Sequence, residues 1–100
     1  MNQYILFMHN DATDRAAAND DQKWGEYLSF LRHSGSFDGG SSIGTGECVN
    51  RDGKVVGLST QLTGFVRVRA ESLHDAKRFL AGNPVHEAGG TVEIRELLQE

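Results

Sequence analysis

TGFVRVRAESLHDAKRFLAGNPVHEAGGTVEIREL, residues 63–97, is the stretch that decides the fold. Its first part alternates between two kinds of side chain with a period of two, which predicts a strand over 63–70. Ser72, with Asp75 three residues later, predicts the start of a helix. Asn83-Pro84 predicts the end of that helix, and Gly89-Gly90 turns the chain into a second alternating strand, 91–97. The segment is therefore a strand–helix–strand unit.

Two predicted helices carry apolar side chains at helical spacing, which marks the face that each buries. In the helix that follows Ser72, this stripe is Leu73, Ala76, Phe79 and Leu80. In an earlier helix, it is Trp24, Tyr27, Leu28 and Leu31. Asn19 or Asp20 is the expected N-cap of the earlier helix, and Gly35 is its expected end.

The N-terminal segment predicts a strand over 3–9. Its bulky apolar residues are continuous, which favours a central strand with both faces covered. The polar stretch that follows, with Ala16-Ala17-Ala18 inside it, is expected to form a mobile loop. Residues 35–46 are rich in glycine and serine and are expected to be irregular, with strand pairing resuming near Ile43.

Asp52-Gly53 predicts the turn of a hairpin whose strands begin at Cys48 and Lys54. The predicted order is thus strand, helix, three strands, helix and strand. Such an order favours an α+β fold of the ferredoxin-like class, with a four- or five-stranded antiparallel sheet and both helices on one face. The length of 100 residues predicts a single domain, 1–100.

Composition excludes several classes of function. The net charge is −4, and no cluster of lysine and arginine is present to neutralise phosphates, so nucleic-acid binding is not expected. The apolar run Tyr4–Met8 is too short to span a bilayer and lacks the basic flank of a signal peptide, so no membrane association is expected. Cys48 is the sole cysteine, which fits a reducing cytoplasm and rules out an internal disulfide.

The chain resembles the YCII-related proteins, in particular the branch known for a DGPF motif. The resemblance lies in the opening YILFMHND, in Trp24 with Tyr27 and Leu31, in NRDGK at 50–54, in ESLHDAKRFLAGNP at 71–84 and in GGTVEIREL at 89–97. The chain has VGLSTQL at 56–62 where that branch has its Asp-Gly-Pro-Phe stretch. The resemblance implies a ferredoxin-like unit that dimerises through its sheets into a dimeric α+β barrel. It also implies dehydrochlorination of aromatic compounds, an activity to which a few members of the family are linked.

His9 and Asp11 are the candidate catalytic residues. His9 ends the first predicted strand, and a histidine beside a carboxylate can act as a general base near neutral pH. The alternative is a strand-end histidine bonded to the backbone or to solvent. The histidines show no metal-ligand spacing such as HExxH, so neither a metal nor another cofactor is expected.

A second group of candidates lies on the two C-terminal strands. The predicted faces place aromatic and charged side chains together, namely Phe65, Arg67, Arg69, Glu93 and Arg95. Guanidinium groups could hold a small anionic or aromatic ligand. Cross-strand ion pairs or a dimer interface would explain the same pattern. His86 precedes the last strand and is a further ligand-binding candidate, whereas His33 and His74 are expected on the surface.

The sequence thus predicts a small-molecule site between the sheet face and the end of the first strand. Acid/base catalysis of elimination or isomerisation on a small carbonyl or phenolic compound is the first hypothesis. A non-catalytic, dimeric ligand-binding or regulatory module is the second. The two differ in whether His9 lies within hydrogen-bond reach of a carboxylate and faces a cavity.

Overall fold

The computed structural model describes residues 1–58 and 60–99. The strands are β1 (Asn2–His9), β2 (Phe37–Ser42), β3 (Cys48–Val49), β4 (Val55–Val56), β5 (Leu62–Ala70) and β6 (Val92–Leu97). The helices are α1 (Arg15–Ala18), α2 (Asp21–His33), α3 (Leu73–Ala76), the 3₁₀ helix η1 (Lys77–Leu80) and α4 (Pro84–Glu87). Among the described residues, no helix has the length and apolar character that crossing a membrane requires.

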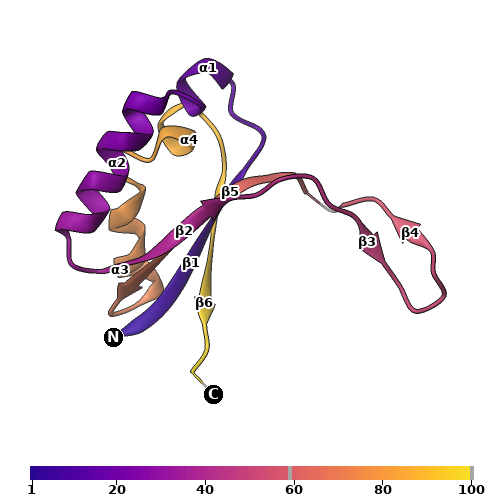
Figure 1. Cartoon of the computed structure of the whole chain (residues 1–100). Coiled ribbons are helices and arrows are strands. Elements are labelled where there is room, and N and C mark those ends of the chain that lie inside the picture. The colour runs from indigo at the N-terminus through magenta and orange to yellow at the C-terminus, as the bar shows by residue number, and fades with distance from the viewer. Residues whose placement is uncertain (59, 100) are drawn as a thin grey trace.

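The main sheet has four antiparallel strands in the order β2-β5-β1-β6. The first and last strands of the chain are therefore neighbours, and the helices lie together on one side of the sheet (Figure 1). This arrangement confirms the predicted α+β, ferredoxin-like class. The sheet has four strands because the hairpin β3–β4 forms a separate two-stranded sheet.

The core lies between the sheet and the helices. Alternate residues of β1 and β5 are buried on this side, namely Tyr4, Leu6, Met8, Val66, Val68 and Ala70. Leu31 of α2 and Phe79 of η1 cover them and have no exposed surface. The Tyr27 hydroxyl donates to the backbone carbonyl of Phe79 at 2.7 Å, which ties α2 to η1 inside the core.

No helix of the described residues lies on the opposite side of the sheet, which we call the open face. On β1 it carries Gln3, Ile5, Phe7 and His9, all of them half-buried. The prediction that both faces of this strand are covered is wrong for the single chain. β1 is central because strands flank it on both sides, and its apolar residues on the open face are covered only by their neighbours in the sheet.

Two segments predicted to be irregular have regular structure. The expected mobile loop contains α1, in which the Asp14 side chain accepts a hydrogen bond from the Ala17 backbone N–H at 3.0 Å. Three alanines, the best helix formers, follow that cap. The glycine-rich stretch forms β2, because Gly40 lets the chain approach β5 so closely that a Cβ there would lie 2.3 Å from the carbonyl oxygen of Phe65.

The second helical region differs from the prediction at both ends. Leu73 is 49% exposed, so the predicted stripe is buried only from Ala76 onward. Pro84 begins the short helix α4 instead of merely ending the preceding one. Proline suits the first helical turn because its missing N–H would have no partner there. The buried Asn83 caps α4 by accepting hydrogen bonds from the backbone N–H groups of Val85 and His86, each at 3.0 Å.

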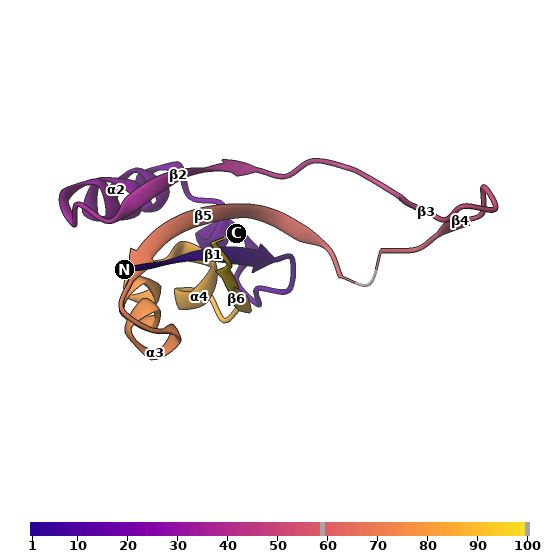
Figure 2. The same ribbon diagram turned by 90° about the horizontal axis from the view of Figure 1, so that it is seen from below.

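The predicted hairpin β3–β4 is confirmed, with Gly53 at φ +79° in its turn. Residues 43–61, which we call the arm, extend away from the rest of the molecule (Figure 2). Ser59 within them lies outside the described residues. The radius of gyration is 14.6 Å, whereas a compact domain of this length has about 13 Å. Val49, Val56 and Leu58 are exposed on the arm, and Cys48 is half-buried there.

Candidate functional site

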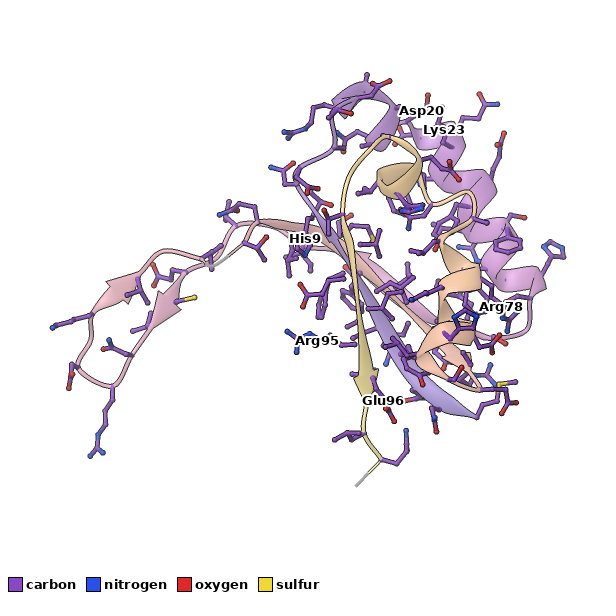
Figure 3. All side chains as sticks on the ribbon, turned by 180° about the vertical axis from the view of Figure 1, so that it is seen from behind. His9, Asp20, Lys23, Arg78, Arg95 and Glu96 are labelled. Atoms are coloured by element: carbon purple, nitrogen blue, oxygen red, sulfur yellow. The ribbon has the colours of Figure 1, made fainter. Side chains whose placement is uncertain are left out.

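His9 lies where β1 ends at the base of the arm (Figure 3). Its side chain contacts the carboxylate of Glu93 on β6. The Nε2 atom of His9 is 3.0 Å from Oε1 of Glu93. The other carboxylate oxygen, Oε2, accepts a hydrogen bond from Nε of Arg95 at 2.8 Å. These three side chains form a continuous line on the open face, which we call the His9 cluster.

The register of the sheet creates the His9 cluster. Phe7 lies opposite Glu93, and Ile5 lies opposite Arg95, so all four point to the open face. The guanidinium of Arg95 is the main cause that lowers the pKa of Glu93, and the hydrogen bond with His9 lowers it further. Glu93 is therefore an ionised carboxylate at neutral pH. It can orient the imidazole of His9 and stabilise its charged form.

Thr60 is a fourth member of the His9 cluster, and no pattern in the sequence indicated it. Its hydroxyl Oγ1 is 3.3 Å from Nδ1 of His9. Because a carboxylate can only accept, Nε2 carries the hydrogen that points to Glu93, and Nδ1 of the neutral ring accepts from Thr60. Thr60 belongs to the stretch 56–62 that departs from the resembled family, so no motif marked it. The basic nitrogen of His9 thus points toward the base of the arm.

Asp11, the carboxylate that the sequence places beside His9, bonds to Thr91. Its carboxylate accepts hydrogen bonds from the Thr91 backbone N–H at 2.8 Å and from the Thr91 hydroxyl at 2.6 Å. These bonds lower the pKa of Asp11, with the Thr91 hydroxyl as the largest cause. Asp11 therefore fastens the start of β6 beside the end of β1, and the carboxylate bonded to His9 is that of Glu93.

The remaining charged candidates form a second group at the other side of the open face. β1 lies between β5 and β6, so the two predicted strands are not neighbours. Arg69 donates to the carboxylate of Asp38 on β2, with Nε 3.1 Å from Oδ2. Arg67 donates to the backbone carbonyl of Asp38 at 2.6 Å. Both arginines are thus held toward β2, away from Glu93.

An aromatic pair separates the two charged groups. The rings of Phe7 and Phe65 lie with their centroids 6.5 Å apart, in the middle of the open face. Phe65, the arginines and Glu93 therefore lie on one face of the sheet, as predicted. Their charges form two separate groups, one around Glu93 and one around Asp38. An aromatic wall beside a His–carboxylate pair suits a flat, weakly acidic ligand.

The other histidines lie apart from this face. His86 is exposed on α4, in the helix layer, and is not brought to the His9 cluster. His33 and His74 are exposed, as expected. Within residues 1–58 and 60–99, no group of three histidine, cysteine, aspartate or glutamate side chains could hold a metal ion.

Comparison with known proteins gives a family and a fold. A family model described as the YCII-related domain matches residues 1–100. No curated protein matches the chain. A solved structure of 5-chloro-2-hydroxyhydroquinone dehydrochlorinase from Burkholderia phenoliruptrix, in complex with 2,5-dihydroxybenzoquinone, matches with a TM-score of 0.60 and 13% sequence identity. The match covers 98% of this chain and 95% of that one, and at this identity it shows a shared fold.

Proposed function

The chain belongs to the YCII-related family, and from this premise we propose that it is an enzyme that moves protons on a small phenolic compound through His9. The observation that carries the proposal is the bond between His9 and Glu93 at 3.0 Å, with Arg95 behind it. A histidine held by a carboxylate has the geometry of a general base. The similar dehydrochlorinase acts on a chlorinated phenol, which guides the choice of test compound.

The proposed reaction is elimination of hydrogen chloride from a chlorinated hydroquinone. Nδ1 of His9 takes a phenolic proton, and the O–H electron pair becomes a C=O bond while the ring carbon that bears chlorine gains a proton. Loss of the second phenolic proton then drives its electron pair into the ring, and the C–Cl electron pair leaves with chloride. The products are a quinone, one proton and one chloride ion, so no oxidant is consumed.

Each residue of the His9 cluster has a defined part in this proposal. Glu93 holds the Nε2 hydrogen and stabilises the imidazolium that forms. Arg95 lowers the pKa of Glu93 and holds its carboxylate in place, and Thr60 occupies the position where the hydroxyl of the substrate would meet Nδ1. Phe7 and Phe65 offer aromatic surface for the ring.

The test uses chlorohydroquinone under anaerobic conditions, with chloride release as the readout. The His9→Gln variant is expected to lose about 10²-fold in rate, the lower end of what general acid–base catalysis contributes. The His33→Gln variant removes an exposed histidine on α2 and should keep the rate of the unchanged protein. Equal rates in the two variants would refute the role of His9.

Binding is followed separately by NMR of the histidine side chains. Chlorohydroquinone should shift the His9 resonances and leave those of His33 and His74 in place. A shift of His9 without chloride release would favour the non-catalytic ligand-binding module. No shift and no chloride release would contradict both hypotheses for this class of compound.

We also propose that a second copy of the chain covers the open face. Its centre is apolar, with Ile5, Phe7 and Phe65, and both signs of charge flank it. A twofold interface pairs a patch with itself, so a mixed patch of this kind is self-complementary. Covering it would exclude water from the half-buried His9.

Light scattering at micromolar concentration is expected to give about twice the chain mass of 11.0 kDa. The Phe7→Asp variant places a charge at the centre of the open face and should give a monomer. The Phe30→Asp variant changes an exposed phenylalanine on α2 and should remain dimeric. A monomeric unchanged protein, or a dimeric Phe7→Asp variant, would rule out this interface.

A further inference from the structure

A second cavity lies on the helix side of the sheet, away from the His9 cluster. It has a volume of about 550 Å³ and opens between α2, β2 and β5. Pockets that hold small organic ligands have about 300–1,000 Å³. Met8 contributes to its lining, and successive side chains of a strand point to opposite faces. His9 therefore points away from this cavity, which no part of the proposed reaction uses.

Glycines form part of the floor of the cavity. Gly40 lies opposite Val66, and Gly64 lies opposite both Met8 and Ser42, so their missing side chains would have faced the helices. A Cβ at Gly64 would lie 3.0 Å from the backbone oxygen of Ser41. Bare backbone at these positions leaves a level surface where other strands of the sheet carry core side chains.

The walls are apolar, and the indole of Trp24 is held in place by its contacts. Trp24 and Leu28 of α2 and Phe37 of β2 line the cavity, and all three are only half-buried. The Trp24 indole N–H donates to the carbonyl of Ala18 at 2.7 Å, and the ring packs edge-on against Tyr27. The indole is therefore oriented before any ligand arrives, which lowers the cost of binding.

One end of the cavity carries the positive charge of Arg32, and the other end carries the negative charge of Asp21. Asp21, Trp24, Leu28 and Arg32 lie along the same side of α2. Asp21 and Arg32 are 11 residues apart, which at 1.5 Å per residue separates them by about 16 Å. Of the ion pairs between described residues, none involves Arg32. The end of the cavity near Leu28 and Phe37 thus combines aromatic surface with a guanidinium available for an anion.

We propose that this cavity is a binding site for a small planar aromatic anion, separate from the His9 cluster. The ring lies over the glycine floor between Trp24 and Phe37, and its carboxylate or phenolate meets Arg32. The glycine backbone and the aromatic walls favour a flat ligand. Arg32 favours a negatively charged one. The site depends on neither the proposed reaction nor dimer formation.

The test titrates the protein with trans-cinnamate and with cinnamyl alcohol, its neutral counterpart of similar shape. Trp24 is the single tryptophan, so its indole N–H gives one NMR signal that reports on the cavity wall. Cinnamate should shift this signal and bind about tenfold more tightly than the alcohol, the effect of one charge-assisted contact. Equal affinity of the two compounds would overturn the assignment of an anion.

Four variants locate the ligand. Arg32→Gln should reduce cinnamate affinity to that of the alcohol, whereas Arg15→Gln removes a charge from α1, outside the cavity, and should change nothing. Ser42→Phe places a ring over Gly64 from an exposed position and should weaken both ligands more than tenfold while the remaining NMR spectrum stays folded. His9→Gln should bind cinnamate as before. Unchanged binding in Ser42→Phe, or loss in His9→Gln, would contradict a separate site.

Discussion

The Phe79→Ala variant is expected to lose about 3–5 kcal/mol of unfolding free energy, the usual cost of removing a large core side chain. Phe79 has no exposed surface and lies where η1 meets the sheet and α2. Domains of this kind have only about 5–15 kcal/mol in total, so the variant should unfold at a much lower urea concentration. Urea unfolding followed by circular dichroism measures the change.

Leu73 provides the matched control within the same helical region. It is 49% exposed, so Leu73→Ala should change the stability by about 0.5 kcal/mol or less. If Phe79→Ala does not fold, Phe79→Leu keeps most of the buried volume and should still be less stable than Leu73→Ala. Equal losses for Leu73→Ala and Phe79→Ala would mean that Leu73 belongs to the core after all.

The Gly40→Ala variant is expected to lose about 3 kcal/mol, the upper end of the usual cost of overpacking. Its new Cβ would lie 2.3 Å from the carbonyl oxygen of Phe65 and 3.0 Å from Cα of Val66. Both are backbone atoms, so no rotation of a side chain relieves the contact. β2 must move away from β5, which breaks their pairing and opens one side of the sheet.

The same change at Gly25 should have the opposite sign. Gly25 lies within α2, and a Cβ there meets no atom within 4 Å. Alanine in a helix is better than glycine by about 1 kcal/mol, so Gly25→Ala should raise the urea midpoint. A stabilising Gly40→Ala, or a destabilising Gly25→Ala, would show that these backbone contacts do not control the stability.

The fold could be predicted where local chemistry agreed with tertiary packing. Asp20 caps α2 through hydrogen bonds from the Gln22 and Lys23 backbone N–H groups, and Gly35 follows that helix at φ +76°. The two-residue alternation of 63–70 placed Val66 and Arg67 on opposite sides of β5, as observed. These caps and this alternation depend on residues close in sequence, and contacts with distant residues did not change the outcome.

The errors have a common physical cause. β2 exists because β5 accepts a closely approaching glycine strand, and glycine by itself favours no strand. Leu73 fits the helical period, but the chain enters the helix at the edge of the core and leaves it exposed. Both outcomes depend on partners distant in sequence, which a local pattern does not contain.

Only part of the candidate site could be predicted, because its contacts also join residues that are distant in sequence. The strand-end position of His9 and the open-face position of Glu93 could be read from alternation. Their contact at 3.0 Å depends on β1 and β6 being neighbours, which the order of strands in the chain leaves open. Thr60 reaches His9 from the base of the arm, a segment without any regular pattern.

The pairing of β1 with β6 also sets the timing of folding during synthesis. β1 is synthesised long before β6, so one of its edges stays unpaired until Val92–Leu97 has emerged from the ribosome. Contacts between residues so far apart form late and slowly. Until then, a nascent chain exposes one edge of the strand that carries His9, and the contact between His9 and Glu93 cannot form.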